Sequence, residues 1–135
     1  MKITIETTVN APLDAVWRAW TTPADIMRWN AASDDWHTTA ATLDLRAGGA
    51  FSFRMEAKDG SFGFDFAGTY THIVPQQVIE MEFGGRTATV EFVAQSGGML
   101  VRETFDAEET HSLEQQRQGW QAILDRFARH VESAR

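Results

Sequence analysis

Apolar residues recur with two different spacings along the chain, and each change of spacing marks a new element. Residues 2–10 alternate between apolar and polar side chains, which predicts a half-buried strand. Helical spacing follows, and Pro12 is expected at the first position of a short amphipathic helix. Its apolar positions are Leu13, Val16, Trp17 and Trp20. Thr22 as N-cap and Pro23 as the first helical residue predict a second short helix directly afterwards.

Between residues 36 and 106 the spacing changes to two, which is typical of strands with one buried face. Glycine-containing breaks interrupt this stretch and predict tight turns. The expected strands cover residues 37–46, 50–57, 62–74, 78–83, 86–95 and 99–106. Because the connections are short, an antiparallel meander is the simplest topology.

The last part of the chain predicts a long helix. Ser112 and Gln115 have the spacing of a capping box. The apolar stripe that follows consists of Leu113, Trp120, Ile123, Leu124, Phe127 and Val131. A sheet with one apolar face and a helix with one apolar stripe bury both surfaces by packing together. We therefore expect an α+β fold, a curved antiparallel sheet wrapped around the C-terminal helix, as a single domain over residues 1–135.

Composition narrows the function classes. The chain contains no cysteine, which excludes disulfides, thiolate metal sites and cysteine nucleophiles. A formal net charge of −7 leaves no basic face, so nucleic acid is not expected as a partner. The sequence has no signal-peptide pattern and no run of about 18 apolar residues. We expect a cytoplasmic protein that does not insert into a membrane.

Five Trp and nine Phe residues are many for a chain of 135 residues, and they favour a cavity that binds a ligand. The alternative is aromatic-rich packing without a ligand. The inward faces of the strands would supply the walls: Phe51, Phe53, Met55, Phe64, Phe66, Met81, Phe83 and Phe92. The lid would consist of Trp20, Trp29 and Trp36, and the floor of Trp120, Leu124 and Phe127.

Polar residues on these faces would orient a ligand. Tyr70 and His72 share the parity of the phenylalanines of their strand, unless Gly68 marks a bulge that changes the register. In the last strand, whichever face turns inward carries a charge, Glu103 on one side and Arg102 on the other. A buried charge is costly unless it lines a wet cavity, and the alternative is a solvated charge at the rim of the sheet.

Two further groups of residues can be interpreted either as part of a ligand site or as ordinary surface structure. Gln116 and Arg117 interrupt the stripe of the long helix and suit the mouth of a pocket, or they belong to a first turn that overhangs the sheet. In the stretch 29–37, two Trp residues bracket two carboxylates and His37 follows directly, a group that could gate or orient a ligand. Alternatively, it is a solvated turn that ends in a residue at the start of a strand.

Standard catalytic and metal-binding motifs are missing. The histidines lie far apart and lack the spacing of a zinc helix. P-loop, dinucleotide-binding and serine-hydrolase motifs do not occur. We expect no metal and no cofactor.

Several stretches resemble a known family. The sequence APLDAVWRAWTTPADIMRW (11–29) is similar to the opening helices, and ETFDAEETHSLEQQRQGWQAILDRF (103–127) to the last strand and long helix, of the family named after the activator of Hsp90 ATPase homologue. WNAASDDWH (29–37) and DLRAGGAFSFRMEAKDGSFGFDFAGTY (44–70) resemble one bacterial subfamily. The family lies within the helix-grip superfamily of Bet v 1-type, START and polyketide-cyclase domains (SRPBCC), and the resemblance covers essentially the whole chain.

The resemblance implies a helix-grip fold and, commonly, an apolar or amphipathic ligand between the sheet and the long helix. We therefore expect a binding module for a small hydrophobic or aromatic molecule, lipid-like or polyketide-like. One alternative is a cyclase-type or hydrolase-type enzyme, with His72 or Glu103 as proton carrier and Tyr70 polarising a carbonyl. Another is a protein-interaction module, including an Hsp90-type activator, although that activity also involves an additional N-terminal domain without a counterpart here. A monomer or weak homodimer is expected.

Overall fold

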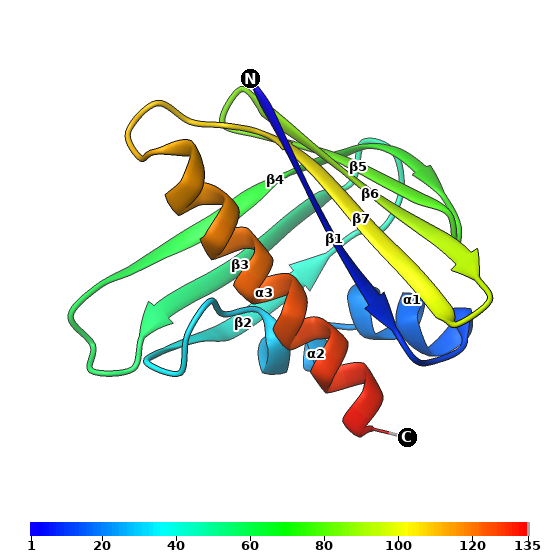
Figure 1. Ribbon diagram of the computed structural model, residues 1–135. Helices are drawn as coiled ribbons and strands as arrows, with labels where there is room; N and C mark the ends of the chain where they lie inside the picture. Colours follow the sequence, from blue (N-terminus) through cyan, green and yellow to red (C-terminus); the bar gives the residue numbers. More distant parts are fainter. Residues whose placement is uncertain (135) are drawn as a thin grey trace.

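One curled antiparallel sheet and three helices make up the computed structural model, which describes residues 1–134 (Figure 1). The elements are β1 (Lys2–Val9), α1 (Leu13–Thr21), α2 (Pro23–Trp29), β2 (Trp36–Leu43), β3 (Ala50–Ala57), β4 (Gly63–Val74), β5 (Val78–Phe83), β6 (Arg86–Gln95), β7 (Gly98–Asp106) and α3 (Leu113–Ser133). The predicted α+β helix-grip fold, with the C-terminal helix inside a curved sheet, is confirmed.

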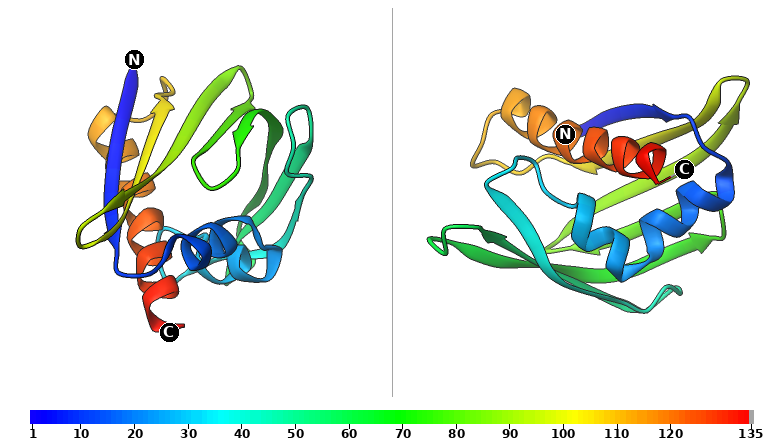
Figure 2. Two further views of the ribbon diagram at one scale, coloured as in Figure 1. Left: turned by 90° about the vertical axis from the view of Figure 1, so that its right-hand side faces the viewer. Right: turned by 90° about the horizontal axis from the view of Figure 1, so that it is seen from below.

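The strands follow one another as the predicted meander. Their order is β1-β7-β6-β5-β4-β3-β2, and every neighbouring pair is antiparallel. The first strand pairs with the last, so β1 and β2 form the two edges of the sheet. Figure 2 shows the sheet curling around α3, with α1 and α2 across one end. The concave face of the sheet is thereby turned toward the helices.

The second strand ends at Leu43, three residues before the expected boundary at residue 46. The reason is a tight turn, in which the Arg46 amide donates to the Asp44 carbonyl and the Gly49 amide to the Arg46 carbonyl. These local hydrogen bonds replace the pairing that a longer strand would have made.

A bulge in β4 changes which side chains face inward. Tyr70 pairs with Met81 and His72 pairs with Glu80, so one extra residue, Thr71, separates the two pairs. The expected inward orientation of His72 is therefore wrong, since the extra residue turns it to the exposed outer face. Gly68 is not the bulge. A Cβ atom there would lie 2.0 Å from the Glu82 carbonyl oxygen, so glycine permits the close approach of β4 and β5.

The helix starts follow the capping signals with one difference. Pro12 is the N-cap of α1, with an extended ψ of 157°, rather than its first helical residue. Thr22 is the N-cap of α2 and Pro23 its first residue, as predicted. The capping box of α3 is confirmed, because the Ser112 hydroxyl accepts from the Gln115 amide while the Gln115 side chain accepts from the Ser112 amide.

The stripe of α3 is buried along its C-terminal half. Leu124, Phe127 and Val131 are almost completely covered, whereas Leu113 is 44% exposed because the first turn extends beyond the sheet. Burial of such a stripe supplies most of the stability of a surface helix. Among the described helices, none is both long and apolar enough to cross a membrane.

Candidate functional site

A cavity of about 290 Å³ lies between the concave face of the sheet and the helices. Strands β3 to β7 supply one side of it, and all three helices contribute to the other. The lining residues are Trp20, Trp29, Asn30, Phe53, Met55, Phe64, Phe66, Tyr70, Met81, Arg86, Glu103, Trp120 and Ile123. Most are aromatic or aliphatic, and the few polar groups are separated from one another along the chain, a composition typical of small-molecule sites.

Ring-on-ring contacts hold the walls in position. The Trp120 indole of α3 stacks on Phe105 of β7, with ring centroids 3.9 Å apart and planes 8° from parallel. On the opposite side, Trp20 lies 4.8 Å from Trp29, whose indole N–H donates to the Ala19 carbonyl at 2.9 Å. Such contacts add to the free energy of burial and fix the orientation of each ring. The cavity is therefore shaped before any ligand enters.

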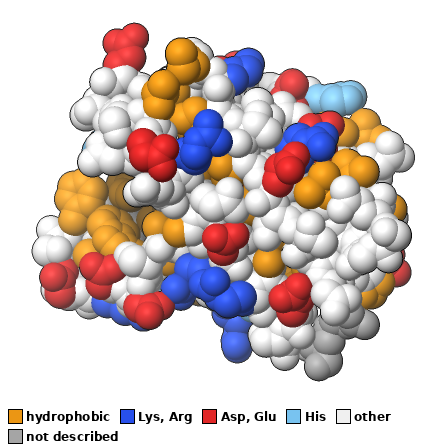
Figure 3. Space-filling view, in the orientation of Figure 1, with side chains coloured by type: hydrophobic (Ala, Val, Ile, Leu, Met, Phe, Trp, Pro, Cys, Tyr) orange, Lys and Arg blue, Asp and Glu red, His pale blue; other side chains and the backbone are white. Residues whose placement is uncertain are grey.

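Among the described residues, Phe64 on the β3–β4 hairpin is the one exposed side chain of the cavity wall, so we infer that the cavity opens there. Phe64 lines the cavity and is 41% exposed, and Phe62 beside it is 62% exposed. The ring of Trp36 is 6.0 Å from each of these two phenylalanines. Figure 3 shows hydrophobic side chains over this part of the surface, where it is hollowed. An apolar rim of this kind gives an uncharged molecule a path into the interior.

Glu103 of β7 is the carboxyl group of the cavity. It is 7% exposed, and its side chain forms no hydrogen bond or ion pair with another described residue, so its oxygens face the cavity. Its paired neighbours are Ile5 on β1 and Val90 on β6, both buried. Burial raises the pKa of Glu103 to about 8, because the charged form has lost its hydration. Near neutral pH this side chain is an uncharged acid.

Tyr70 contributes a second polar atom from β4, on the far side of β5 and β6 from Glu103. The ring is 4% exposed and packs 5.1 Å from Phe51. Burial raises the pKa of the Tyr70 hydroxyl, which bonds to no other described side chain or main-chain group. The hydroxyl is thus a hydrogen-bond donor at every physiological pH.

Arg86 marks the end of the cavity nearest the start of α3. Its guanidinium donates to the main-chain carbonyl of Asp106 through Nε at 3.1 Å and Nη2 at 2.8 Å. It also lies 5.1 Å from the centroid of the Phe83 ring. Glu103 pairs with Val90, four residues further along β6, so the Cα atoms of Arg86 and Val90 are about 13 Å apart along the strand. Arg86 and Glu103 therefore lie at different ends of the cavity.

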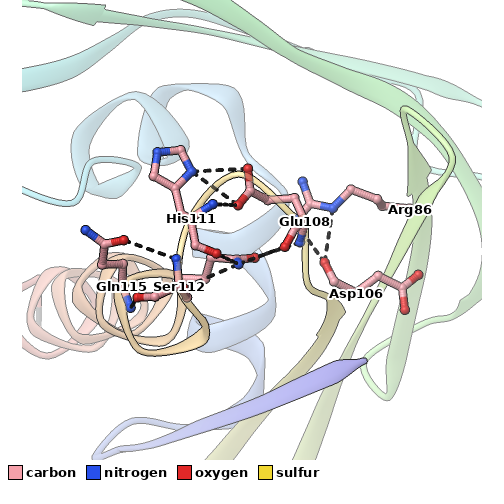
Figure 4. Close-up of polar contacts among 7 residues, drawn as sticks. Arg86, Asp106, Glu108, His111, Ser112 and Gln115 are labelled. Carbon is pink, nitrogen blue, oxygen red and sulfur yellow. Dashed lines mark hydrogen bonds and ion pairs between the residues drawn. The ribbon is translucent and has the colours of Figure 1, made fainter.

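A second, more polar cavity of about 240 Å³ lies beyond Arg86. Its wall includes Glu108, His111 and Gln115, and it shares Arg86 and Trp120 with the first cavity. Figure 4 shows how these groups bond mainly to one another. The Glu108 carboxylate accepts from the His111 amide at 2.6 Å, and that bond is the main cause of its lowered pKa. This second space is therefore bounded by a self-contained polar loop.

Gln116 is part of that loop structure rather than of the first cavity. Its side-chain oxygen accepts from the Glu108 amide at 2.8 Å, and its nitrogen donates to the carbonyls of Glu108 and His111. These bonds explain why a glutamine is 7% exposed in the stripe of α3. Arg117, one residue later, is exposed and donates to the Thr4 carbonyl of β1 at 2.9 Å.

Comparison with known proteins assigns the chain to a family. The family described as "Activator of Hsp90 ATPase homolog 1-like protein" matches residues 10–132. The chain belongs to this family. The resemblance seen in its helices and last strand is thereby confirmed, and the fold agrees with the SRPBCC superfamily. Among proteins with curated functions, none matches this member of the family.

Solved structures of relatives support the same assignment. An AHSA1-like protein from Aeromonas hydrophila is 50% identical, with a TM-score of 0.94 over 99% of this chain and 94% of that one. A protein from Cytophaga hutchinsonii is 45% identical, with a TM-score of 0.85 over 98% and 93%. One from Nitrosomonas europaea is only 18% identical but has a TM-score of 0.82 over 99% and 96%, which shows that the fold is shared.

Many of the residues expected at a ligand site come together on the wall of the first cavity. They are Trp20, Trp29, Phe53, Met55, Phe64, Phe66, Tyr70, Met81, Glu103 and Trp120. The alternation of the strands accounts for much of this agreement, since the inward parity of β3 and β5 is the one that the sequence pattern indicates. For β7 the pattern leaves both faces open, and the structure turns the face with Glu103 inward.

The other expected residues lie elsewhere. Five of them pack behind the wall or deeper in the core, namely Phe51, Phe83, Phe92, Leu124 and Phe127. His37 lies on the edge strand β2 opposite Glu56, and Trp36 flanks the open end without lining the cavity. Neither His72 nor Arg117 reaches the cavity, because the bulge turns the first outward and the second faces β1.

Arg86 and Ile123 line the cavity without having been singled out by the sequence pattern, and Asn30 lines it from the stretch 29–37, the group with a possible gating role. Arg86 has the same parity as Ala88 and Val90, so the alternation of β6 could have indicated it. Asn30 is the C-cap of α2, where no periodic pattern applies, and its amide donates to the Thr38 hydroxyl at 3.1 Å.

Proposed function

We propose that the protein binds a small, largely apolar molecule in the cavity between the sheet and α3. The observation that carries this proposal is an interior space of about 290 Å³ whose wall is mostly aromatic. Protein interiors normally close-pack and leave few voids larger than a water molecule. A chain with so many large side chains could fill such a space, and a retained apolar cavity is characteristic of ligand sites.

The size and shape of the space limit the ligand. Its volume lies at the lower end of the range for small-molecule sites, about 300–1,000 Å³. The occupant is therefore a molecule of one or two rings, or a short aliphatic chain. It enters at the β3–β4 hairpin, where the rings of Phe62, Phe64 and Trp36 form an apolar rim.

A filled cavity provides the direct test. Uncharged aromatic, alicyclic and aliphatic compounds of about 10–15 non-hydrogen atoms are titrated by calorimetry into the protein and into the variant Ile123→Phe, which adds a ring from α3 to the cavity. The control is Leu113→Phe, which adds the same kind of bulk on the same helix at an exposed position. We expect saturable binding that Ile123→Phe weakens at least tenfold and Leu113→Phe leaves unchanged.

Two results would contradict the proposal. The first is that no compound of the three chemical types binds the unmodified protein. The second is that a compound binds equally well to Ile123→Phe, which would place it outside the cavity.

Acid–base catalysis on such a ligand is a second candidate, favoured by Glu103 alone. A pKa of about 8 suits a group that gives and takes a proton near neutral pH. A bound compound that is chemically changed by the protein, but not by Glu103→Gln, would identify an enzyme. Unchanged compound after prolonged incubation with the protein would favour a binding module.

A further inference from the structure

Among the residues that the structure describes, none carries a charge that compensates the Glu103 carboxylate. Ile5 of β1 and Val90 of β6 flank it in the sheet, and α3 contributes Trp120 and Ile123 to the wall above. Arg102 and its ion-pair partner Glu6 face outward. The other ionisable groups on the wall are Tyr70 from β4 and Arg86 from β6, and neither contributes to the shift of the Glu103 pKa.

A buried carboxyl group without a partner costs free energy in either protonation state. The ionised form has lost its hydration, which is the larger cost. The neutral acid carries one O–H donor, and leaving a donor unpaired in an apolar space costs about 1–3 kcal/mol. A molecule that fills the cavity and accepts this hydrogen bond removes that cost, whereas a pure hydrocarbon does not.

We propose that Glu103, as an uncharged acid, donates a hydrogen bond to a neutral acceptor oxygen, such as a ketone carbonyl, of an aromatic ligand, and that protein, ligand and one proton bind together. This inference rests on the proposed function of the cavity and names the chemical class of its ligand. No covalent step is involved, and the proton stays on the Glu103 carboxyl group in the complex.

The remaining wall favours a neutral ligand over a cationic one. Arg86 is the one cation on the cavity wall among the described residues, and no carboxylate within ion-pair distance neutralises it there. An amine that is protonated by Glu103 would place a second cation in the same cavity as the Arg86 guanidinium. A ketone requires no proton transfer and adds no charge, because it accepts a hydrogen bond from the neutral acid.

Three probes with one carbon skeleton separate these possibilities: acetylnaphthalene, ethylnaphthalene and naphthylethylamine. Each is titrated by calorimetry at pH 6 and pH 9. We expect acetylnaphthalene to bind about tenfold more tightly than ethylnaphthalene at pH 6, which corresponds to one hydrogen bond. At pH 9 its affinity falls about tenfold because Glu103 ionises in the free protein, while the affinity of ethylnaphthalene changes less.

Two variants of Glu103 provide matched controls. Glu103→Gln keeps a donor of the same size that does not titrate, so its affinity for acetylnaphthalene is expected to be the same at both pH values. Glu103→Leu removes the donor, so the preference for acetylnaphthalene over ethylnaphthalene disappears while both still bind. Calorimetry at pH 8 in buffers of different ionisation enthalpy should show proton uptake with the native protein and none with Glu103→Gln.

Other outcomes overturn the inference. They are an affinity for acetylnaphthalene that is independent of pH, or naphthylethylamine as the tightest ligand with an affinity that rises with pH. A third is a preference for acetylnaphthalene that disappears in Tyr70→Phe but survives in Glu103→Leu. That result would show that Tyr70, and not Glu103, donates the hydrogen bond to the ligand. In these cases the proposed function stands, whereas failure of all three probes to bind would contradict the proposed function as well.

Discussion

Trp120 lies flat against Phe105, with 3.9 Å between the ring centroids and 8° between the planes. This pair joins α3 to β7, and Phe105 is completely buried. Trp120 also lines both cavities. Together with the buried side chains of Leu124, Phe127 and Val131, this contact holds α3 at the distance from the sheet on which the volume of the site depends.

Loss of the Trp120 ring should be costly for this reason. We expect Trp120→Ala to lower the free energy of unfolding by about 3 kcal/mol, the low end for truncation of a large aromatic side chain because Trp120 is half-buried. Trp36→Ala at the rim is the matched control, with an expected loss of less than about 1 kcal/mol. Urea denaturation measures both. Equal losses would contradict the assigned role of the stack.

The burial of Glu103 should make the stability of the protein fall as the pH rises. The folded-state pKa is raised to about 8 from 4.5, so the folded protein holds a proton that the unfolded chain releases. Stability from this group is fully present below about pH 4.5 and is lost as the pH rises toward 8. Relative to Glu103→Gln, the native protein should lose roughly 4 kcal/mol between pH 4 and pH 9. A constant difference across denaturation experiments at these pH values would show that Glu103 is solvated.

Substitution of Gln116 should weaken the loop before α3 and should not act through the ligand cavity. Gln116→Leu removes its bonds to Glu108 and His111 and should cost about 2 kcal/mol. Hydrogen exchange at the Glu108 amide should accelerate more than exchange at the centre of the sheet. Gln118→Leu, on an exposed face of α3, is the control and should change neither quantity. Unaltered exchange at Glu108 in Gln116→Leu would refute the role in the loop.

Substitution of alanine for two of the glycines should change the stability of the protein in opposite directions. At Gly68 the new Cβ would meet the Glu82 carbonyl at 2.0 Å, so Gly68→Ala should destabilise the protein by about 2 kcal/mol. At Gly119, inside α3, nothing lies within 4 Å, and Gly119→Ala should stabilise the protein by up to about 1 kcal/mol. Thermal unfolding of both variants is the measurement. A stable Gly68→Ala variant would mean that β4 and β5 are further apart.

The sequence pattern predicted the meander and the capping box of α3 because both depend on local spacing. Its alternation also placed Glu103 on the side of Phe105 and Val101, which is the buried side. His72 was misplaced because a bulge depends on pairing with β5 and leaves no mark in the spacing. The C-cap position of Asn30 and the loop bonds of Gln116 depend on the folded chain in the same way.

Interior volume is the feature that the sequence could indicate only through its number of aromatic residues. Whether such rings fill a core or line a cavity depends on how the sheet curls around α3. Phe92 and Phe127 illustrate the first case, because Trp20 covers both at ring distances of 6.0 and 4.9 Å. Phe53 and Phe66 illustrate the second, since they border the open space.

The most direct test of the central claim follows the five Trp indole N–H signals by two-dimensional NMR during a titration with acetylnaphthalene. Trp20, Trp29 and Trp120 line the cavity, whereas Trp17 packs on Phe92 away from it. The account predicts saturable shifts with one common dissociation constant at those three signals and no shift at Trp17. Unchanged signals at all three, or equal shifts at every Trp, would contradict it.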